Sequence, residues 1–375
     1  MTLLTREDDR KRPGVHALLV GVGAYPYMHK WSELPEVPGN LSTGHQLSSP
    51  YHSVEALAQW LRDDLRVHDA PLRSLRVLAS GSATVPGRYT APTLDAIKTS
   101  CRAWFDDAHE HEENIALFYF CGHGLTSGQV WALLADDFGL DTVHEPFEAT
   151  FEPNLLVDGM QKCRAGRQLF MIDACSRPSP RAKRFKNFRP RDLISFEDNE
   201  NLAKQTLILA SEFGTQAFGQ RKGVSLFMEG FLAAVRGGAT EPADEQPDTW
   251  VVKANALKRS INHAISKRPG GSKQEVSFGK VSTDFEFHEL AGEPIVPVQV
   301  KCLPSEYEAS STLEVALQKR HVLEGLPWTL DLPYGTHDFH AVEEQPRGRK
   351  VVHGSKLDVP VVPPFAKVSI RCGDE

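Results

Sequence analysis

The first two thirds of the chain alternate short apolar runs with segments whose apolar residues recur at helical spacing. This alternation is typical of a parallel β-sheet that is covered by helices on both faces. Each apolar run is nearly continuous, as expected for a strand buried on both sides. The sequence therefore predicts strands at residues 16–21, 75–80, 115–121, 168–173 and 206–211, with an edge strand at 274–278.

The segments between these strands predict helices. Apolar residues share one helical face at 54–61, 94–108, 226–235 and 257–265, and Ser53 is expected to cap the first of these helices. The helical pattern stops at the Pro269-Gly270-Gly271 break. From about residue 294 apolar and polar residues alternate one by one, with turn signals at 333–335 and 346–348, which is typical of a small β-sandwich.

A chain of 375 residues is long enough for two domains. We predict an α/β domain at 14–285, built as a three-layer α/β/α sandwich with a mostly parallel central sheet. A small all-β domain is predicted at 294–375. The second domain has no motif of its own, and we expect it to bind a protein partner.

Charge and composition exclude several classes of function. The net charge of −7 gives no reason to expect a nucleic-acid partner or an anionic membrane surface. No apolar run reaches the length of a membrane helix, and residues 1–13 are charged where a secretory peptide would be apolar, so a cytoplasmic protein is expected. The six cysteines have neither disulfide-framework nor zinc-site spacing.

We also expect neither a metal nor another cofactor. The run His109–Glu113 places consecutive residues in different directions around a helix, which disfavours a metal site. The segment Gly21-Val22-Gly23-Ala24 lacks the third glycine of a dinucleotide-binding motif, and Tyr25-Pro26-Tyr27 opens no helix. A nucleotide-binding function is therefore disfavoured.

Two strand ends carry reactive residues. The strand at 115–121 leads into Gly122-His123-Gly124, and the strand at 168–173 leads into Cys175. Because the carboxyl ends of neighbouring parallel strands open into one crevice, His123 and Cys175 are expected to face each other. A histidine within hydrogen-bond reach activates a thiol and can return the proton to a leaving amine, which is the chemistry of acyl transfer. The N–H groups of Gly124 and Cys175 are the expected oxyanion hole.

These motifs resemble those of the caspase-like cysteine peptidases, clan CD, peptidase C14. The resemblance rests on Gly122-His123-Gly124 followed, 52 residues after the histidine, by Asp173-Ala174-Cys175. The strand at 17–21, the segments 211–217 and 223–227, and Gln274 also resemble family segments, so the likeness covers roughly residues 14–285. Asp173 in place of the glutamine of animal caspases is similar to the metacaspase and bacterial branch.

The resemblance implies a substrate pocket and a processing loop. Asp173 would look into the pocket for the residue before the cleaved bond and would select arginine or lysine. Cys121 stands where metacaspases commonly have serine, and the aspartate that they place before the first helix is replaced around Ser53. The implied division is a large-subunit-like part at 14–175, a basic loop at 176–204 and a small-subunit-like part at 205–285. Cleavage sites are expected in an exposed loop, at Arg177, Arg181, Lys183, Arg184, Arg189 and Arg191.

The resulting hypothesis is a cysteine endopeptidase that cleaves protein substrates after arginine or lysine through Cys175 and His123. The loop at 176–191 would be cut by the protein itself or by an upstream activating protease, and the resemblance places such enzymes in bacterial defence or death pathways. The alternative is a catalytically silent caspase-fold scaffold that binds a partner, because a fold alone does not guarantee activity. Cys121 and the other four cysteines are expected to fill the core.

Overall fold

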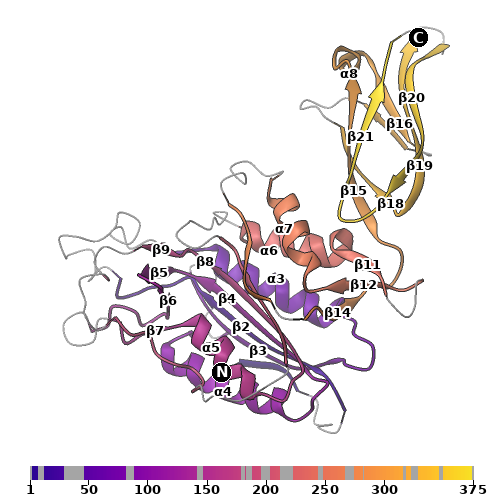
Figure 1. Cartoon of the computed structure of the whole chain (residues 1–375). Helices are drawn as coiled ribbons and strands as arrows, with labels where there is room; N and C mark the ends of the chain where they lie inside the picture. Colours follow the sequence, from indigo (N-terminus) through magenta and orange to yellow (C-terminus); the bar gives the residue numbers. More distant parts are fainter. Residues whose placement is uncertain are drawn as a thin grey trace. The chain divides into compact units, whose positions relative to one another are not determined.

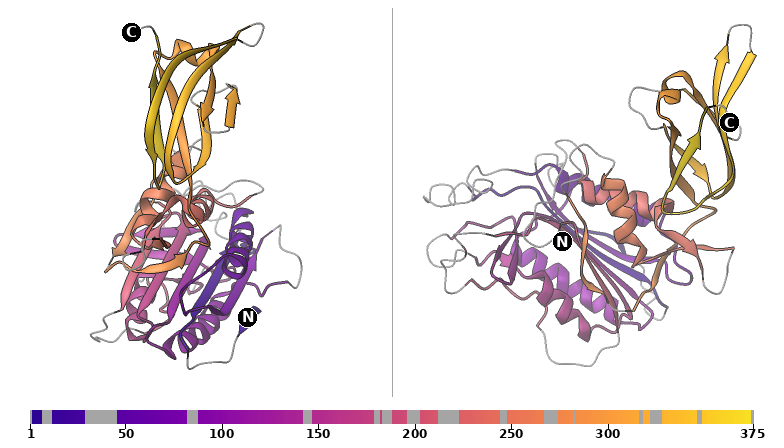
Figure 2. Two further views of the ribbon diagram at one scale, coloured as in Figure 1. Left: turned by 90° about the vertical axis from the view of Figure 1, so that its right-hand side faces the viewer. Right: turned by 45° about the horizontal axis from the view of Figure 1, so that its top comes forward.

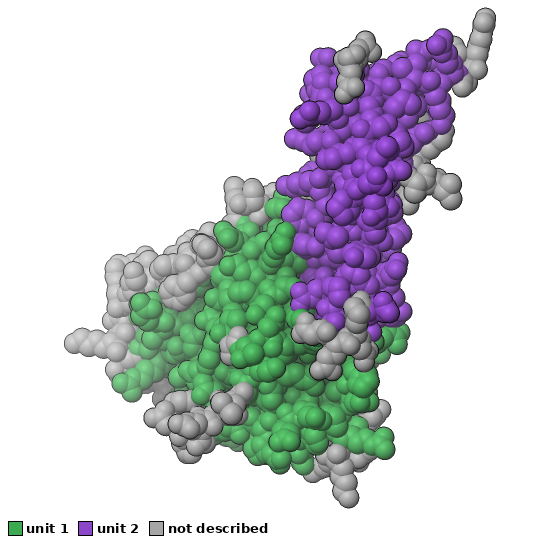
Figure 3. All heavy atoms as spheres, turned by 45° about the vertical axis from the view of Figure 1, so that its right-hand side comes forward, with its two compact units in different colours: residues 1–232, 253–289 green, residues 233–252, 290–375 purple. Residues whose placement is uncertain are grey.

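The computed structural model describes residues 2–6, 12–28, 46–81, 88–141, 147–178, 182, 188–195, 203–211, 223–243, 248–266, 274–281, 283–315, 318–321, 328–345 and 349–373. Two compact units are distinguished (Figure 3): unit 1 comprises residues 1–232 and 253–289, and unit 2 comprises residues 233–252 and 290–375. The segment 233–252 lies inside the predicted 14–285 domain. Among the described helices, none is both long and apolar enough to span a bilayer.

Unit 1 is built on a seven-stranded sheet within its described residues, with strand order β1-β3-β2-β4-β8-β10-β13. The five inner strands are parallel, whereas the two edge strands pair antiparallel with their neighbours. The sheet is therefore mostly parallel, as predicted. Its strands are β1 (Thr2–Arg6), β2 (Val15–Val22), β3 (Leu72–Ser80), β4 (Ile115–Gly122), β8 (Arg167–Ala174), β10 (Lys204–Leu209) and β13 (Ser277–Val281).

Helices cover both faces of this sheet (Figures 1 and 2). One face carries α4 (Leu94–His109) and α5 (Pro153–Gly159), which runs on into the short 3-10 helix η1 (Met160–Lys162). The opposite face carries α3 (Ser49–Asp63), α6 (Leu226–Ala233) and α7 (Ala256–Ser266). The predicted three-layer α/β/α arrangement is confirmed.

Three local expectations need correction. Helix α3 begins at Ser49 behind Ser48 and has a proline in its first turn, so Ser53 is not its cap but a buried residue one turn inside it. The predicted edge strand at 274–278 exists as β13, shifted a few residues toward the C-terminus. Strand β1 was not predicted, and neither was a small sheet of order β7-β6-β5-β9, formed by β5 (Gly124–Ser127), β6 (Val130–Leu134), β7 (Thr150–Phe151) and β9 (Arg177–Pro178).

Side chains of the inner strands alternate between the two layers of helices. In β4, Phe118 and Phe120 belong to the core cluster that includes Trp104 of α4. On the other face, a Cβ at Gly21 of β2 would meet Val54 of α3, so that helix lies close to the sheet. Odd-numbered residues of β4 and β8, including Tyr119 and Asp173, share this second face. Alternation thus places polar side chains beneath α3 near the carboxyl ends of the strands.

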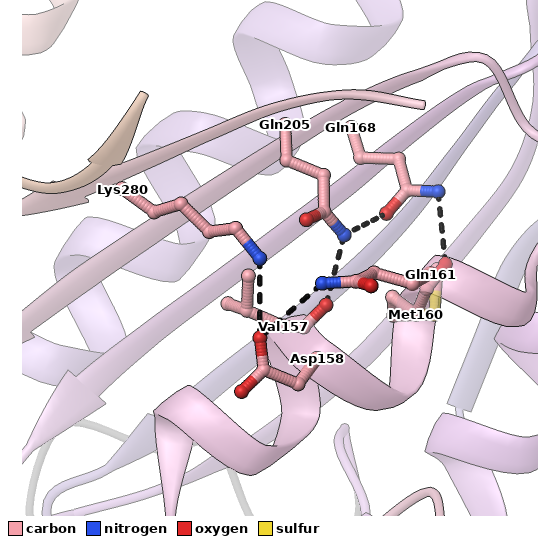
Figure 4. A network of polar contacts seen from close by, with 7 residues as sticks. All are labelled: Val157, Asp158, Met160, Gln161, Gln168, Gln205 and Lys280. Carbon is pink, nitrogen blue, oxygen red and sulfur yellow. Dashed lines mark hydrogen bonds and ion pairs between the residues drawn. The ribbon is translucent and has the colours of Figure 1, made fainter. Parts of the chain in front are cut away.

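Two buried glutamines tie α5 and η1 to the sheet (Figure 4). Gln168 of β8 and Gln205 of β10 are cross-strand partners, and the Gln205 amide donates to the Gln168 side-chain oxygen at 3.0 Å. The same amide group donates to the Val157 carbonyl at 2.8 Å, and the Gln168 amide donates to the Met160 carbonyl at 3.1 Å. Because helix ends leave carbonyls without intrahelical partners, the glutamines satisfy groups that burial would otherwise penalise.

Unit 2 contains two sheets around one apolar cluster, of order β18-β15-β21 and β17-β16-β19-β20 in its described residues. Trp328, Leu330, Leu332 and Leu313 are buried in this cluster, as the period of two predicted, and the turn at Tyr334 lies where expected. The C-terminal β-rich region is confirmed. Its elements are β15 (Ile295–Leu303), α8 (Glu306–Ser310), β16 (Thr312–Val315), β17 (Gln318–His321), β18 (Trp328–Pro333), β19 (Gly335–Gln345), β20 (Arg349–Val361) and β21 (Ala366–Arg371).

The remaining elements precede this region in the chain. They are the π-helix η3 (Ala234–Gly238), β11 (Thr240–Pro242), β12 (Trp250–Lys253) and β14 (Glu286–Glu289). Within unit 2 the indole of Trp250 packs against the ring of Tyr334, with centroids 4.5 Å apart.

Candidate active site

Strand register brings His123 and Cys175 together. Strands β4 and β8 pair in parallel up to Gly122 and Ala174, and the pairing resumes between β5 and β9 at Leu125 and Arg177. Every one of these pairs lies 52 residues apart in the chain, the same separation as His123 and Cys175. Since neighbouring strands lie about 4.8 Å apart, this register places the backbones of the histidine and the cysteine side by side at the carboxyl ends of β4 and β8.

The backbone of His123 is held on both sides. Its N–H donates to the hydroxyl of Tyr25 at 2.7 Å, and its carbonyl accepts from the N–H of Leu134 at 3.0 Å. The imidazole also packs against the Tyr25 ring, with centroids 4.8 Å apart. Both His123 and Cys175 are partly exposed, so each is within reach of a substrate.

The two glycines around His123 are needed for close approach. A Cβ at position 122 would lie 2.8 Å from the Tyr25 hydroxyl, and one at position 124 would lie 2.4 Å from the carbonyl oxygen of Cys175. The Cys175 carbonyl also accepts from the indole N–H of Trp131 at 3.3 Å. The two glycines therefore admit groups of the chain itself, the Tyr25 hydroxyl and the Cys175 carbonyl.

Asp173 is buried in a polar cluster on the same sheet face. Its Oδ2 atom accepts from the Tyr119 hydroxyl at 3.0 Å and from the Ser225 hydroxyl. Ser225 in turn accepts from the N–H of Met228 in α6 at 3.0 Å, and its own N–H donates to the Ser53 hydroxyl at 2.9 Å. The carboxyl group is thus connected to α6 and α3 through two serines.

Burial governs the charge of this carboxyl group. It raises the pKa of Asp173 from its ordinary value to about 6, while hydrogen bonds from Ser225, Tyr119 and Cys121 oppose that rise. Desolvation disfavours the ionised form, whereas donors to the carboxylate favour it. Near neutral pH the group is therefore mostly ionised, in a setting where its charge is poorly solvated.

Cys121 belongs to this polar cluster rather than to purely apolar packing. Burial, followed by the charge of Asp173, raises the pKa of its thiol well above the ordinary value, which leaves it unreactive. Core filling is confirmed for Cys101, Cys163 and Cys302, all fully buried, whereas Cys372 is partly exposed. In the described part of the chain no group of three or more potential metal ligands comes together.

The basic loop is anchored where the structure describes it. Ala182, Phe188 and Leu193 are buried, so the expectation of an exposed, flexible segment does not hold at these positions. Arg189 and Arg191 are exposed, but the backbone of Arg191 is bonded to Thr150 and Glu152. The backbone of Arg177 is paired in β9. Arg181, Lys183 and Arg184 lie outside the described residues.

Sequence reasoning missed four residues around the site. Tyr119 precedes Cys121 by two positions on the same strand, so strand alternation pointed to it. Ser225 is a typical capping residue directly before an apolar helix. Tyr25, in the loop after the first predicted strand, and Trp131, within an apolar run, carry no sequence signal of their own. Of these, Tyr119 and Ser225 had a usable sequence signal.

The chain is similar to several known proteins. Residues 15–275 match the family model described as the caspase domain. An uncharacterized protein of Sinorhizobium fredii, y4kE, is 28% identical over 255 residues, which cover 64% of this chain and 72% of that protein. The crystal structure of GSU0716 from Geobacter sulfurreducens shares 12% identity and a TM-score of 0.45, covering 72% of this chain and 94% of that one. The crystal structure of caspase-1 from Spodoptera frugiperda shares 12% identity and a TM-score of 0.41, covering 72% of this chain and 87% of that one.

Proposed function

The chain belongs to the caspase domain family, and from that membership together with the pairing of His123 and Cys175 we propose that it is a cysteine endopeptidase. The carrying observation is that the flanking strand pairs hold these two residues at the same 52-residue offset on both sides. A rigid pair of strands, rather than a loose loop, therefore sets their spacing, as efficient catalysis requires.

In the proposed reaction the Cys175 thiolate attacks the scissile carbonyl carbon after His123 has taken the thiol proton. The N–H groups of Gly124 and Cys175 stabilise the oxyanion, a contribution of about 3 to 4 kcal/mol per donor in comparable sites. His123 then protonates the leaving amine. Water activated by His123 hydrolyses the acyl-enzyme, and the thiol is regenerated.

Asp173 supports a preference for arginine or lysine before the cleaved bond. It lies two residues before Cys175, the hydroxyl groups of Tyr119 and Ser225 hold its Oδ2 atom, and as a carboxylate it can bind a substrate cation. Ser53 and Cys121 flank the carboxyl group where metacaspases have aspartate and serine, so the pocket has a single acid. We propose membership of the metacaspase and bacterial branch because Asp173 stands where animal caspases have glutamine.

Activation is proposed to follow cleavage in the basic loop, by the protein itself or by an upstream protease. Arg191 and Arg177 are the weakest candidates, because a peptide must be extended and free of backbone pairing to enter a protease cleft. The cut is then expected among Arg181, Lys183, Arg184 and Arg189. Protein substrates, a cytoplasmic location and a role in bacterial defence complete the proposal.

Fluorogenic peptides ending in Arg, Lys, Asp or Leu test the proposal directly. We expect turnover of the Arg and Lys peptides by the wild type and none by Cys175→Ala, while Cys372→Ser, which alters a cysteine of unit 2, stays active. Asp173→Asn should lower kcat/KM for the Arg and Lys peptides by about 10- to 100-fold, the equivalent of one charge-assisted hydrogen bond. The Leu peptide should be unaffected.

Expression of the wild type beside Cys175→Ala adds the test of self-processing. Fragments ending after a loop arginine or lysine in the wild type alone indicate self-cleavage; equal fragments in both indicate another protease. Inactivity on all four peptides, with the chain cleaved in the loop, would favour a silent scaffold over an enzyme.

A further inference from the structure

Tyr25 lies next to His123 although 98 positions separate them in the chain. It follows β2, and β2 is the neighbour of β4 in the sheet, so the loop after β2 passes beside the residues that follow β4. The Tyr25 side chain makes two different contacts with His123. Its hydroxyl accepts the His123 N–H at 2.7 Å, and its ring packs against the imidazole with centroids 4.8 Å apart.

The position of Tyr25 is itself fixed. The side-chain oxygen of Gln46 accepts the Tyr25 N–H at 2.7 Å, and the side-chain nitrogen of Gln46 donates to the Tyr25 carbonyl at 3.2 Å. The next residue, Leu47, donates its N–H to the carbonyl of Gly23 at 2.8 Å. The ring is buried, with 1% of its surface exposed. A side chain held at its backbone and enclosed at its ring can serve as a rigid support.

The hydroxyl fits only because position 122 is glycine. A Cβ there would lie 2.8 Å from the Tyr25 oxygen, closer than real Cβ atoms come to any heavy atom, and would also press on Phe120 at 3.0 Å. Gly122 and Tyr25 therefore form a matched pair. The histidine that follows Gly122 is placed by this pair.

We propose that Tyr25 is the positioning residue of His123, which sets the orientation of the imidazole toward the Cys175 thiol. The inference rests on the proposed cysteine peptidase chemistry, since it gives Tyr25 a role only through the histidine. Tyr25 does not exchange protons in this role. Its phenol is enclosed, and the titratable groups whose charges bear on it are Cys121, Asp136 and Cys175.

The phenol stays neutral across the working pH range. Burial, the largest influence, raises the pKa of Tyr25 well above its ordinary value, so the hydroxyl remains a hydrogen-bonding group. Any pH-dependent effect of Tyr25→Phe therefore reports on His123 and Cys175 rather than on the phenol itself.

The rate of Cys175 alkylation by iodoacetamide, measured from pH 5 to 9, tests the role without a peptide substrate. All variants carry Cys372→Ser, because the remaining cysteines of the described chain apart from Cys175 are buried. A correctly oriented imidazole lowers the apparent pKa of the thiol. Tyr25→Phe keeps the ring but deletes the acceptor, and should shift the alkylation profile to higher pH with roughly a tenfold lower rate near pH 7.

Tyr89→Phe is the matched control, because it also deletes a tyrosine hydroxyl bonded within unit 1, to Glu55, but one that does not contact His123. Its alkylation profile should coincide with the wild type. Gly122→Ala displaces the hydroxyl instead of deleting it and should shift the profile in the same direction as Tyr25→Phe. In the double variant the shift of the alkylation profile should be smaller than the sum of the two single shifts, because the Cβ added at position 122 no longer meets the Tyr25 oxygen.

A Tyr25→Phe profile that coincides with the wild type overturns the inference, whatever happens to stability. A shift of profile without any peptide cleavage supports the positioning role and counts against the peptidase. Cleavage of peptides by the wild type, combined with an unchanged Tyr25→Phe profile, supports the peptidase and counts against the positioning role. An equal shift of the alkylation profile in Tyr89→Phe and Tyr25→Phe would also count against the inference, since the effect would then be one of general stability.

Discussion

Asp173 shows how strongly one residue depends on its surroundings. A carboxyl group at the end of a strand is usually solvated, but here only 4% of the residue is exposed. Three hydrogen-bonding side chains from β4 and from the residue before α6 compensate in part for the lost water. The result is a carboxyl group whose charge state changes close to physiological pH, which is common at functional sites.

This residue gives a pH-dependent prediction. Because the pKa of Asp173 is about 6 in the folded protein and near 3.8 in the unfolded chain, the native state binds the extra proton between those values. Its stabilising contribution is full below about pH 4 and is lost as the pH rises to about 6. Relative to Asp173→Asn, the free energy of unfolding of the wild type should fall over that window by an amount on the order of 3 kcal/mol.

Urea denaturation of both proteins at intervals between pH 4 and 7 measures this difference. The Asn variant keeps the shape and can still bond to the Tyr119 and Ser225 hydroxyls, so it isolates the titration. Parallel stability curves for the two proteins would show that the Asp173 carboxyl group titrates as it does in the unfolded chain.

At the scale of elements, polar side chains decide how the short helices attach to the sheet. Helix α5 is only two turns long; Gln205 donates to its Val157 carbonyl, and Gln168 donates to the carbonyl of Met160 in η1 (Figure 4). On the outer side, Lys280 of the edge strand β13 pairs with Asp158 at 3.1 Å, with both side chains more than a third exposed. One contact is buried and the other is solvated.

The two contacts should therefore contribute unequally. Gln205→Leu leaves the Val157 carbonyl and the Gln168 side-chain oxygen without a buried donor, and should lower the free energy of unfolding by about 1 to 3 kcal/mol per orphaned group. Lys280→Ala, the solvated control, should cost less than about 1 kcal/mol. Equal costs in urea denaturation would show that burial does not set the strength of this network.

At the scale of the whole molecule, each unit has a hydrophobic cluster of its own among the described residues. The cluster of unit 1 surrounds Phe118 and Trp104, and the cluster of unit 2 surrounds Phe339 and Leu330; they have no residue in common. Each of these two clusters can therefore be weakened separately.

This division predicts two responses. Phe339→Ala removes a fully buried ring from unit 2 and should lower the melting temperature of that unit, at a cost of about 3 to 5 kcal/mol, while the alkylation profile of Cys175 stays unchanged. Phe118→Ala should weaken unit 1 by a similar amount and reduce the fraction of molecules with a reactive dyad. Differential scanning calorimetry with the alkylation assay separates the two, and a single shared transition lowered equally by both variants would contradict the division.

The sequence by itself determined the three layers, the positions of the main parallel strands and the placement of His123 and Cys175 at the ends of neighbouring strands. These features depend on local periodicity and on the rule that parallel strands end at one edge, so residues near in the chain suffice to predict them. The start of helix α3 at Ser49 was not predicted, because Ser53 is a typical capping residue and a proline precedes it. In the structure the turn that contains this proline is helical.

The tertiary structure alone decided what surrounds the dyad. Tyr25 meets His123, and Ser225 meets Asp173 and Ser53, only because the sheet stacks distant segments side by side, and hydrogen bonds across such distances leave no periodic trace in the sequence.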